Sequence, residues 1–219
     1  MGITPVLAAA LAGVPIGIQR QGAWAGRRQL FIRFAGPAET ATMYTAEALA
    51  REVARGLSRS PLHSVCISGR DALGNADFLE AALRTLATRT PVMADTDGQR
   101  PEAIAVLHPY VQMVQVTLET PVAEAMMDRA METLRSAARG GCQHSVAIAG
   151  TDEASDADYL RIVEQAHAAS EAVSIIVHPG PATEKGVLDR RWSVLLEHAM
   201  ARHPDVRLAL RMTGPATTR

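Results

Sequence analysis

The feature that most constrains the fold is a regular alternation of short apolar runs with helical patterns along the 219 residues. The apolar runs have the length of strands, are rich in Val and Ile, and show little polar alternation, which is typical of parallel strands covered on both faces. With right-handed crossovers, the alternation predicts an α/β fold of six β-α units and a final strand. The predicted strands are Leu30–Phe34, Ser64–Ser68, Pro91–Ala94, Met113–Leu118, Ser145–Ala149, Ser174–His178 and Val206–Leu210.

Helical patterns occupy the segments between these runs. Thr45 precedes TAEALAREVARGL as an N-cap, and Asn75 is predicted to cap NADFLEAALRTLA in the same way. VAEAMMDRAMETLRSAARGG ends at a glycine pair suited to a C-cap, and SDADYLRIVEQAHAA and DRRWSVLLEHAMARH complete the set. Periodicity leaves open whether the sheet is a doubly wound open sheet or a curved partial barrel. Because no linker or composition shift divides the chain, we expect one domain spanning 1–219.

Composition narrows the possible partners and the compartment. Hydrophobic residues make up 47% and charged residues 21%, as in an ordinary globular protein, and the net charge of −1 predicts neither nucleic-acid nor membrane binding. The apolar N-terminal segment is short and lacks a basic region, so we expect an ordinary first segment and a cytoplasmic protein. The two cysteines, Cys66 and Cys142, lie in apolar runs and are predicted to be buried free thiols.

Candidate site residues follow the predicted strands, because ligands of both architectures bind beyond the carboxyl ends of parallel strands. Arg70 would hold an anion, Asp95 or Asp97 would act as a base or cation ligand, and His178 would act as an acid or base. Each has a plainer interpretation: a surface turn at GRDALG, a turn or cap at DTDG, and a hydrogen-bonded histidine at the end of a strand. Two carboxylates without further ligands do not predict a metal site.

The segment IQRQGAWAGRRQLFIRFAG, from Ile18 to Gly36, resembles the IQGEG-W-GRP-FVRLAG motif of the 7-carboxy-7-deazaguanine synthases. These radical S-adenosylmethionine enzymes contract the ring of a 6-carboxy-tetrahydropterin. DTDG is similar to their ETNG, and HPYVQMVQVTLE resembles the helix and strand that follow it. The resemblance runs in order through nearly the whole chain and implies a partial (β/α)6 barrel. The positions expected to bind ligand are Gln19, Gln21, Trp24, Arg27, Gly69, Arg70, Asp97 and Thr117.

The chain departs from that family where the chemistry is performed. The CxxxCxxC loop that holds a [4Fe–4S] cluster is here GPAETATMYT, with Pro37 at the first cysteine position and only Met43 as a sulfur side chain. The GGEP that holds the methionine amino group is GRDA, the glutamate of QGEG is Gln21, and the C-terminal HK is missing. Since an open-iron cluster needs three thiolates, we expect no iron–sulfur cluster, and the altered contacts argue against S-adenosylmethionine.

Two functions remain open from the sequence. The first is a non-catalytic descendant of the synthases that binds a pterin- or purine-like ligand or a protein partner, as a homodimer or a heteromer. Met126, Met127 and Met131 would then form an adaptable exposed surface, or else belong to the core. The alternative is a cluster-independent enzyme, of acid–base or lyase type, acting on a small anionic or pterin/purine-like substrate. The segment Pro37–Tyr44 is expected to be shortened or repacked through Met43 and Tyr44.

Overall fold

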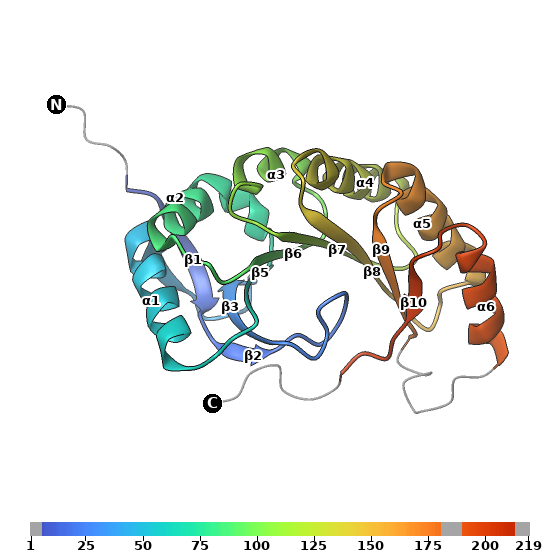
Figure 1. Ribbon diagram of the computed structural model, residues 1–219, viewed down its shortest axis with the longest axis horizontal. Helices are drawn as coiled ribbons and strands as arrows, with labels where there is room; N and C mark the ends of the chain where they lie inside the picture. The colour runs from blue at the N-terminus through green and yellow to red at the C-terminus, as the bar shows by residue number, and fades with distance from the viewer. Residues whose placement is uncertain (1–5, 181–189, 213–219) are drawn as a thin grey trace.

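The computed structural model describes residues 6–180 and 190–212, which form a curved, mostly parallel sheet with helices along its outer side (Figure 1). The sheet has 10 strands in the order β10-β9-β8-β7-β6-β5-β3-β1-β4, and β2 pairs with β3 off this path. From β3 through β5 to β10 neighbouring strands are parallel, whereas β1 lies antiparallel between β3 and β4. The predicted α/β class is therefore confirmed.

The elements follow one another along the chain as strand and helix in alternation after a short N-terminal group of strands. The strands are β1 (Ala8–Gly13), β2 (Ile16–Ile18), β3 (Arg28–Phe34), β4 (Thr42–Thr45), β5 (Ser64–Gly69), β6 (Val92–Thr96), β7 (Met113–Glu119), β8 (Gln143–Ala149), β9 (Ser174–His178) and β10 (Val206–Leu208). The helices are α1 (Ala46–Arg59), α2 (Ala76–Leu86), α3 (Pro101–Leu107), α4 (Glu124–Arg139), α5 (Asp156–Ala169) and α6 (Arg190–Met200), with a 3-10 turn η1 (Ala72–Asn75).

Every apolar run predicted as a strand forms one, but β1, β2 and β4 were not predicted. β1 is rich in alanine and buries only Ala9 and Leu11, so its apolar signal is weak. β4 lies in the GPAETATMYT segment, and it forms because Met43 and its neighbours pair with β1 in antiparallel register. The expected repacking of that segment holds for Tyr44, which packs against the core. It is wrong for Met43, whose exposed fraction is 66%.

The two faces of the sheet differ, which corrects the expectation that both are apolar and covered. In β7, Val114, Val116 and Leu118 pack with helix residues on the outer face. The alternate residues Gln115 and Thr117 belong to the inner face, because successive side chains of a strand point to opposite faces. Polar side chains at alternate positions of other strands continue this inner face, among them Gln29, Ser64, Asp95, Ser145 and His178. The inner face is therefore the place where polar chemistry is concentrated.

The helix ends bear out part of the sequence prediction. The Thr45 hydroxyl accepts a hydrogen bond from the Ala48 backbone N–H at 3.2 Å, which confirms the predicted N-cap of α1. Asn75 is not a side-chain cap, because η1 precedes α2 and Asn75 makes no side-chain cap hydrogen bond. Gly141 follows α4 with a φ of 72°, as the predicted glycine C-cap requires. Helix α3 supplies the helix that six β-α units require after β6, although no helical pattern was assigned to its residues from the sequence.

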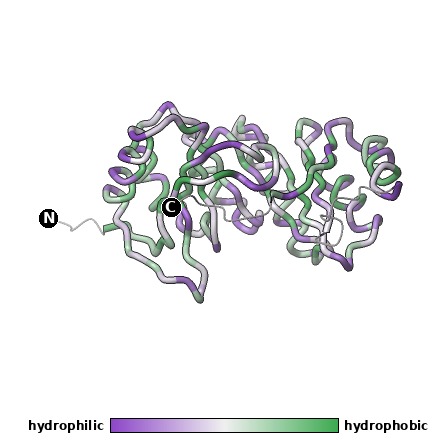
Figure 2. Tube along the Cα trace, turned by 90° about the horizontal axis from the view of Figure 1, so that it is seen from below, coloured by the Kyte–Doolittle hydropathy of each residue, from purple (hydrophilic) through white to green (hydrophobic). Residues whose placement is uncertain are grey.

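The helices bury one side and expose the other, and Figure 2 shows hydrophobic and hydrophilic stretches alternating along them. Of the two interpretations of the α4 methionines, the core one describes two of the three residues. Met127 and Met131 are buried in the core, and only Met126 is exposed. The thiols of Cys66 and Cys142 are free and buried, as predicted. In the described ranges, no helix is both long enough and apolar enough to cross a membrane.

Candidate functional site

The loop between β2 and β3, from Gln19 to Arg27, forms a hairpin that we call the inner hairpin. Its base is closed by two backbone hydrogen bonds, from Gln19 N–H to the Arg27 carbonyl at 2.9 Å and from Gly26 N–H to the Gln19 carbonyl at 2.8 Å. The segment therefore continues the β2–β3 pairing. In Figure 1 it is the dark blue loop on the inner side of the curved sheet.

Three side chains of the inner face bind the inner hairpin. Gln19 Nε2 donates to Asp95 Oδ2 at 3.1 Å, from the hairpin to β6. Backbone N–H groups of the hairpin donate to Gln115 Oε1 of β7 at 3.0 Å and to His178 Nε2 of β9 at 2.9 Å. The residue that donates to His178 is Gly22, whose φ is 79°. A Cβ atom added at Gly22 would lie 1.7 Å from Gln115 Oε1. The positive φ therefore favours glycine, and a side chain at this position would displace the Gln115 amide from its contact with the hairpin.

Beneath the inner hairpin lies a small apolar layer. Cys66, Met93 and Met113 are buried side by side, and Trp24 of the hairpin packs against them. The Trp24 ring also meets the His63 ring edge-on, with centroids 4.8 Å apart. Burial, with a contribution from nearby Asp95, raises the pKa of the Cys66 thiol well above its ordinary value. Cys66 is therefore a neutral packing residue and no candidate nucleophile.

Asp95 sits among neutral hydrogen-bond donors. The Thr117 hydroxyl donates to Asp95 Oδ1 at 2.8 Å, while Gln19 occupies the other oxygen. Burial raises the pKa of the Asp95 carboxyl, and hydrogen bonds from Thr117, Gln19 and Gln115 offset this only in part. Gln115 Nε2 is buried without a partner in good hydrogen-bond geometry among the described residues, although its amide is near enough to act on Asp95. A carboxylate in such surroundings is suited to accept hydrogen bonds or to take up a proton.

His178 is fully buried and uses both ring nitrogens. Nδ1 lies 2.7 Å from the Ala209 carbonyl oxygen, which can only accept, so Nδ1 carries the proton. Nε2 therefore accepts from Gly22, and the ring is neutral. Burial lowers the pKa of His178, and the charge of Arg211 lowers it further. Of the two interpretations drawn from the sequence, the hydrogen-bonded histidine at a strand end describes this geometry.

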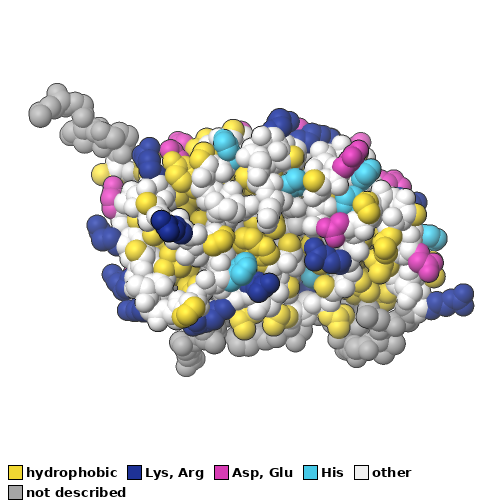
Figure 3. Space-filling model, in the orientation of Figure 1, with side chains coloured by type: hydrophobic (Ala, Val, Ile, Leu, Met, Phe, Trp, Pro, Cys, Tyr) yellow, Lys and Arg dark blue, Asp and Glu magenta, His cyan; other side chains and the backbone are white. Residues whose placement is uncertain are grey.

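A pocket of about 630 Å³ lies at the carboxyl ends of the strands on the β7–β10 side of the sheet. Glu119 ends β7, Gly150 follows β8, and Arg211 follows β10. The pocket carries both signs of charge, as does the face of the molecule in Figure 3, where basic and acidic side chains are intermixed. We call it the mouth pocket; its lining is Glu119, Thr120, Pro121, Gly150, Thr151, Asp152, Glu153 and Arg211.

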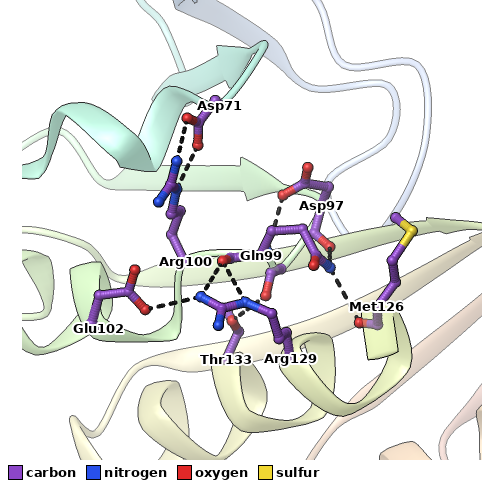
Figure 4. A network of polar contacts seen from close by, with 9 residues as sticks. Asp71, Asp97, Gln99, Arg100, Glu102, Met126, Arg129 and Thr133 are labelled. Carbon is purple, nitrogen blue, oxygen red and sulfur yellow. Dashed lines mark hydrogen bonds and ion pairs between the residues drawn. The ribbon is translucent and has the colours of Figure 1, made fainter. Parts of the chain in front are cut away.

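The predicted residues Asp97 and Arg70 lie apart from the inner hairpin contacts. Asp97 is exposed, and its carboxylate accepts the backbone N–H of Gln99 at 3.0 Å, so DTDG is a turn closed by an aspartate side chain. Figure 4 shows this turn beside Arg100, which makes a two-pronged ion pair with Asp71 at 2.8 and 2.7 Å. Arg70 is exposed next to that pair.

Gly69 has a structural reason to be glycine. Its φ is 100°, and a Cβ there would lie 2.2 Å from the Phe34 carbonyl oxygen at the end of β3. Of the predicted site residues, the structure joins four through the inner hairpin: Gln19, Asp95, Thr117 and His178. Gln21 and Trp24 belong to the same hairpin, whereas Arg70 and Asp97 are exposed and take no part in these contacts. Arg27 closes the base of the hairpin through its backbone and has an exposed side chain.

Sequence reasoning missed Gln115 and Arg211, and it did not choose the residues after β7 and β8 that line the mouth pocket as candidate site residues. The signal for Gln115 was the polar alternation within MVQVTLE, where it occupies the same face as Thr117. Glu119 and Asp152 were visible as polar residues after strands, but nothing local in the sequence joins them to Arg211. In the described part of the chain, no group of three or more His, Cys, Asp or Glu side chains is arranged to hold a metal ion.

Comparisons with known proteins give weak structural similarities only. No protein-family model matches the chain, and no curated protein matches its sequence. A type I 3-dehydroquinate dehydratase from Clostridium difficile, with covalently modified comenic acid, is 13% identical over 94% of this chain and 81% of its own, with a TM-score of 0.42. QR15, an aldolase, is 10% identical over 73% and 84%, with a TM-score of 0.35. Neither similarity is close enough to carry an argument about function.

Proposed function

We propose that this chain is a cluster-less relative of the 7-carboxy-7-deazaguanine synthases, built as a partial (β/α)6 barrel, that binds a pterin- or purine-like molecule without radical chemistry. The observation that carries the proposal is the mouth pocket, which combines carboxylates with a guanidinium at the carboxyl ends of the parallel strands. Ligands of such sheets bind at this edge. The resemblance of the Ile18–Gly36 segment gives the ligand class.

The chemistry of the mouth pocket suits a 2-amino-4-oxo-pyrimidine ring. Such a ring presents a ring N–H and an amino group side by side, and one carboxylate accepts both in a two-pronged arrangement. In this proposal Glu119, at the end of β7, accepts both groups, and Arg211 donates to a carboxylate or oxo group of the same ligand. The volume of about 630 Å³ lies within the range of small-molecule pockets.

The residues present do not fit an iron–sulfur cluster. Cys66 is buried within β5, and Cys142 precedes β8, where its thiol donates to the Val111 carbonyl at 3.2 Å. The segment after β3, from Ala35 to Thr45, contains no thiol. Three thiolates cannot converge from this chain, so no step of radical chemistry is assigned to it.

Isothermal titration calorimetry with pterin, 6-carboxypterin, guanine, adenine and S-adenosylmethionine tests the proposal. We expect the 2-amino-4-oxo compounds to bind and adenine, which lacks that edge, to bind at least tenfold more weakly. Glu119→Gln and Arg211→Ala each remove one charged hydrogen-bond partner and should weaken binding on the order of 10-fold to 100-fold. Glu171→Gln, an exposed residue outside the mouth pocket, is the matched control. Binding that neither pocket variant weakens would place the ligand elsewhere.

A further inference from the structure

We propose that the inner hairpin is a cover over the inner face of the sheet, held closed by neutral His178 and released when that imidazole takes up a proton. This inference goes beyond the proposed function and does not depend on it, because it concerns contacts within the chain. It rests on the bond from Gly22 N–H to His178 Nε2 at 2.9 Å, which joins the hairpin to β9.

The bond is possible for one protonation state only. With Nδ1–H directed at the Ala209 carbonyl 2.7 Å away, the neutral ring offers its Nε2 lone pair to Gly22. A second proton on the ring would place an N–H at Nε2 against the N–H of Gly22, two donors facing each other. Turning the ring does not relieve this, because Nδ1 is already held by the segment after β10.

The segment after β10 also contacts the inner hairpin directly. Met212 N–H donates to the Arg20 carbonyl at 3.1 Å, so the chain after β10 crosses to the hairpin on the side of His178. His178 thus joins β9, to which it belongs, to the inner hairpin and to the residues after β10. A change in the charge of its ring therefore affects the contacts of all three segments.

The charged groups near this site set the direction of the response. Arg211, after β10, disfavours the charged imidazole, as burial does, and both lower the pKa of His178. Asp95 of β6 holds the hairpin separately through Gln19, and its pKa is raised. His63, before β5, contacts Trp24, and its own pKa is lowered by burial and by Arg27. Arg20 and Arg27 are carried by the hairpin itself. The cover should therefore stay closed at neutral pH and open in acid.

Nuclear magnetic resonance of the full ¹⁵N-labelled chain tests the inference in one sample. Long-range ¹⁵N correlations follow the ring nitrogens of His178, while amide exchange, corrected for the intrinsic effect of pH, follows Gly22 and Ala23. We expect the Nδ1–H tautomer at pH 7 and protonation with a midpoint below the ordinary histidine pKa of about 6.5. Protection of Gly22 and Ala23 should fall at least about tenfold at that same midpoint. Protection of Ile148, buried in β8, should not change.

Variants separate His178 from the other titrating groups. His178→Gln keeps an acceptor near the place of Nε2 but cannot be protonated, so the acid-induced loss of protection should disappear. His63→Gln and Asp95→Asn should leave the loss in place. If the His178 variant fails to fold, the unmodified chain still tests the inference, because ring protonation and the loss of amide protection must have the same midpoint. Unchanged protection of Gly22 after the ring has been protonated, or loss that disappears in the His63 or Asp95 variant, would overturn the inference.

Discussion

The Thr117 hydroxyl donates to Asp95 Oδ1 at 2.8 Å, which joins the inner-face side chains of the neighbouring strands β7 and β6. The partners of Asp95 in these contacts are neutral: a hydroxyl and the amide of Gln19. Because no opposite charge balances the half-buried carboxylate in these contacts, its ionisation costs stability, and its pKa is raised.

This relationship predicts how stability depends on pH. An unfolded aspartate has a pKa of about 3.9, and that of folded Asp95 is higher, so the folded chain binds the proton more tightly. The stability contributed by protonated Asp95 is fully present below about pH 3.9 and is lost as the pH rises through the folded pKa. Asp95→Asn keeps an oxygen for Thr117 without a charge to bury. We expect it to unfold at an equal or higher urea concentration than the unmodified chain at pH 7.

Thr117→Val provides the matched test of the same explanation. It removes a hydrogen bond that lowers the pKa of Asp95, so the folded pKa should rise further. The pH at which stability is lost should move upward, as measured by urea unfolding between pH 4 and 7. Two results would show that the Asp95 carboxylate is not the source of this pH dependence. One is a lower pH for the loss of stability in Thr117→Val, and the other is a much larger loss of stability at pH 7 in Asp95→Asn than in Thr117→Val.

Gly69→Ala should destabilise the protein by about 2–5 kcal/mol, because a left-handed backbone and a clash of Cβ with the Phe34 carbonyl act together. Gly141→Ala is the matched control. Its φ is also positive, at 72°, but a Cβ there meets nothing within 4 Å, so only the backbone cost of about 1–2 kcal/mol is expected. Urea unfolding of both variants measures the difference. Equal losses would mean that the close approach at the end of β3 is readily relaxed.

Anaerobic reconstitution with iron and sulfide should give a colourless protein without cluster absorption. The physical reason is that the chain has only two cysteines, on separate elements, and both are buried. A brown, iron-loaded product from the purified chain alone would contradict this. Thiols lent by a second chain would have to come from a different protein, and mixing with such a partner would reveal them.

Much of the fold could be predicted because it rests on local patterns. The apolar runs gave β3 and the parallel strands from β5 onward, and Thr45 marked the start of α1. β1 and β4 could not be predicted in the same way, since their pairing joins segments that are weakly apolar and depends on contact between them. Likewise Asn75 has the right residue type for a cap, but the η1 turn before α2 takes its place.

The candidate site could be predicted only in part, for a related reason. Asp95, Thr117 and His178 follow from their positions near the ends of strands, and the structure joins them to the inner hairpin. Their hydrogen bonds could not be predicted from their positions in the sequence. Nothing in the sequence indicates that Ala209 and Gly22 bind the two ring nitrogens of His178. The mouth pocket joins β7, β8 and the residue after β10, which are distant in sequence.

The most direct test of the central claim is a titration of the ¹⁵N-labelled chain with 6-carboxypterin, followed by amide chemical shifts. The claim predicts saturable shifts at Gly150 and Thr151, which line the mouth pocket, and their loss in Arg211→Ala. It also predicts unchanged chemical shifts for buried amides that do not line the mouth pocket, such as Ala94 in β6. Shifts confined to Gly22 and Ala23 of the inner hairpin, or no shifts at millimolar ligand, would contradict it.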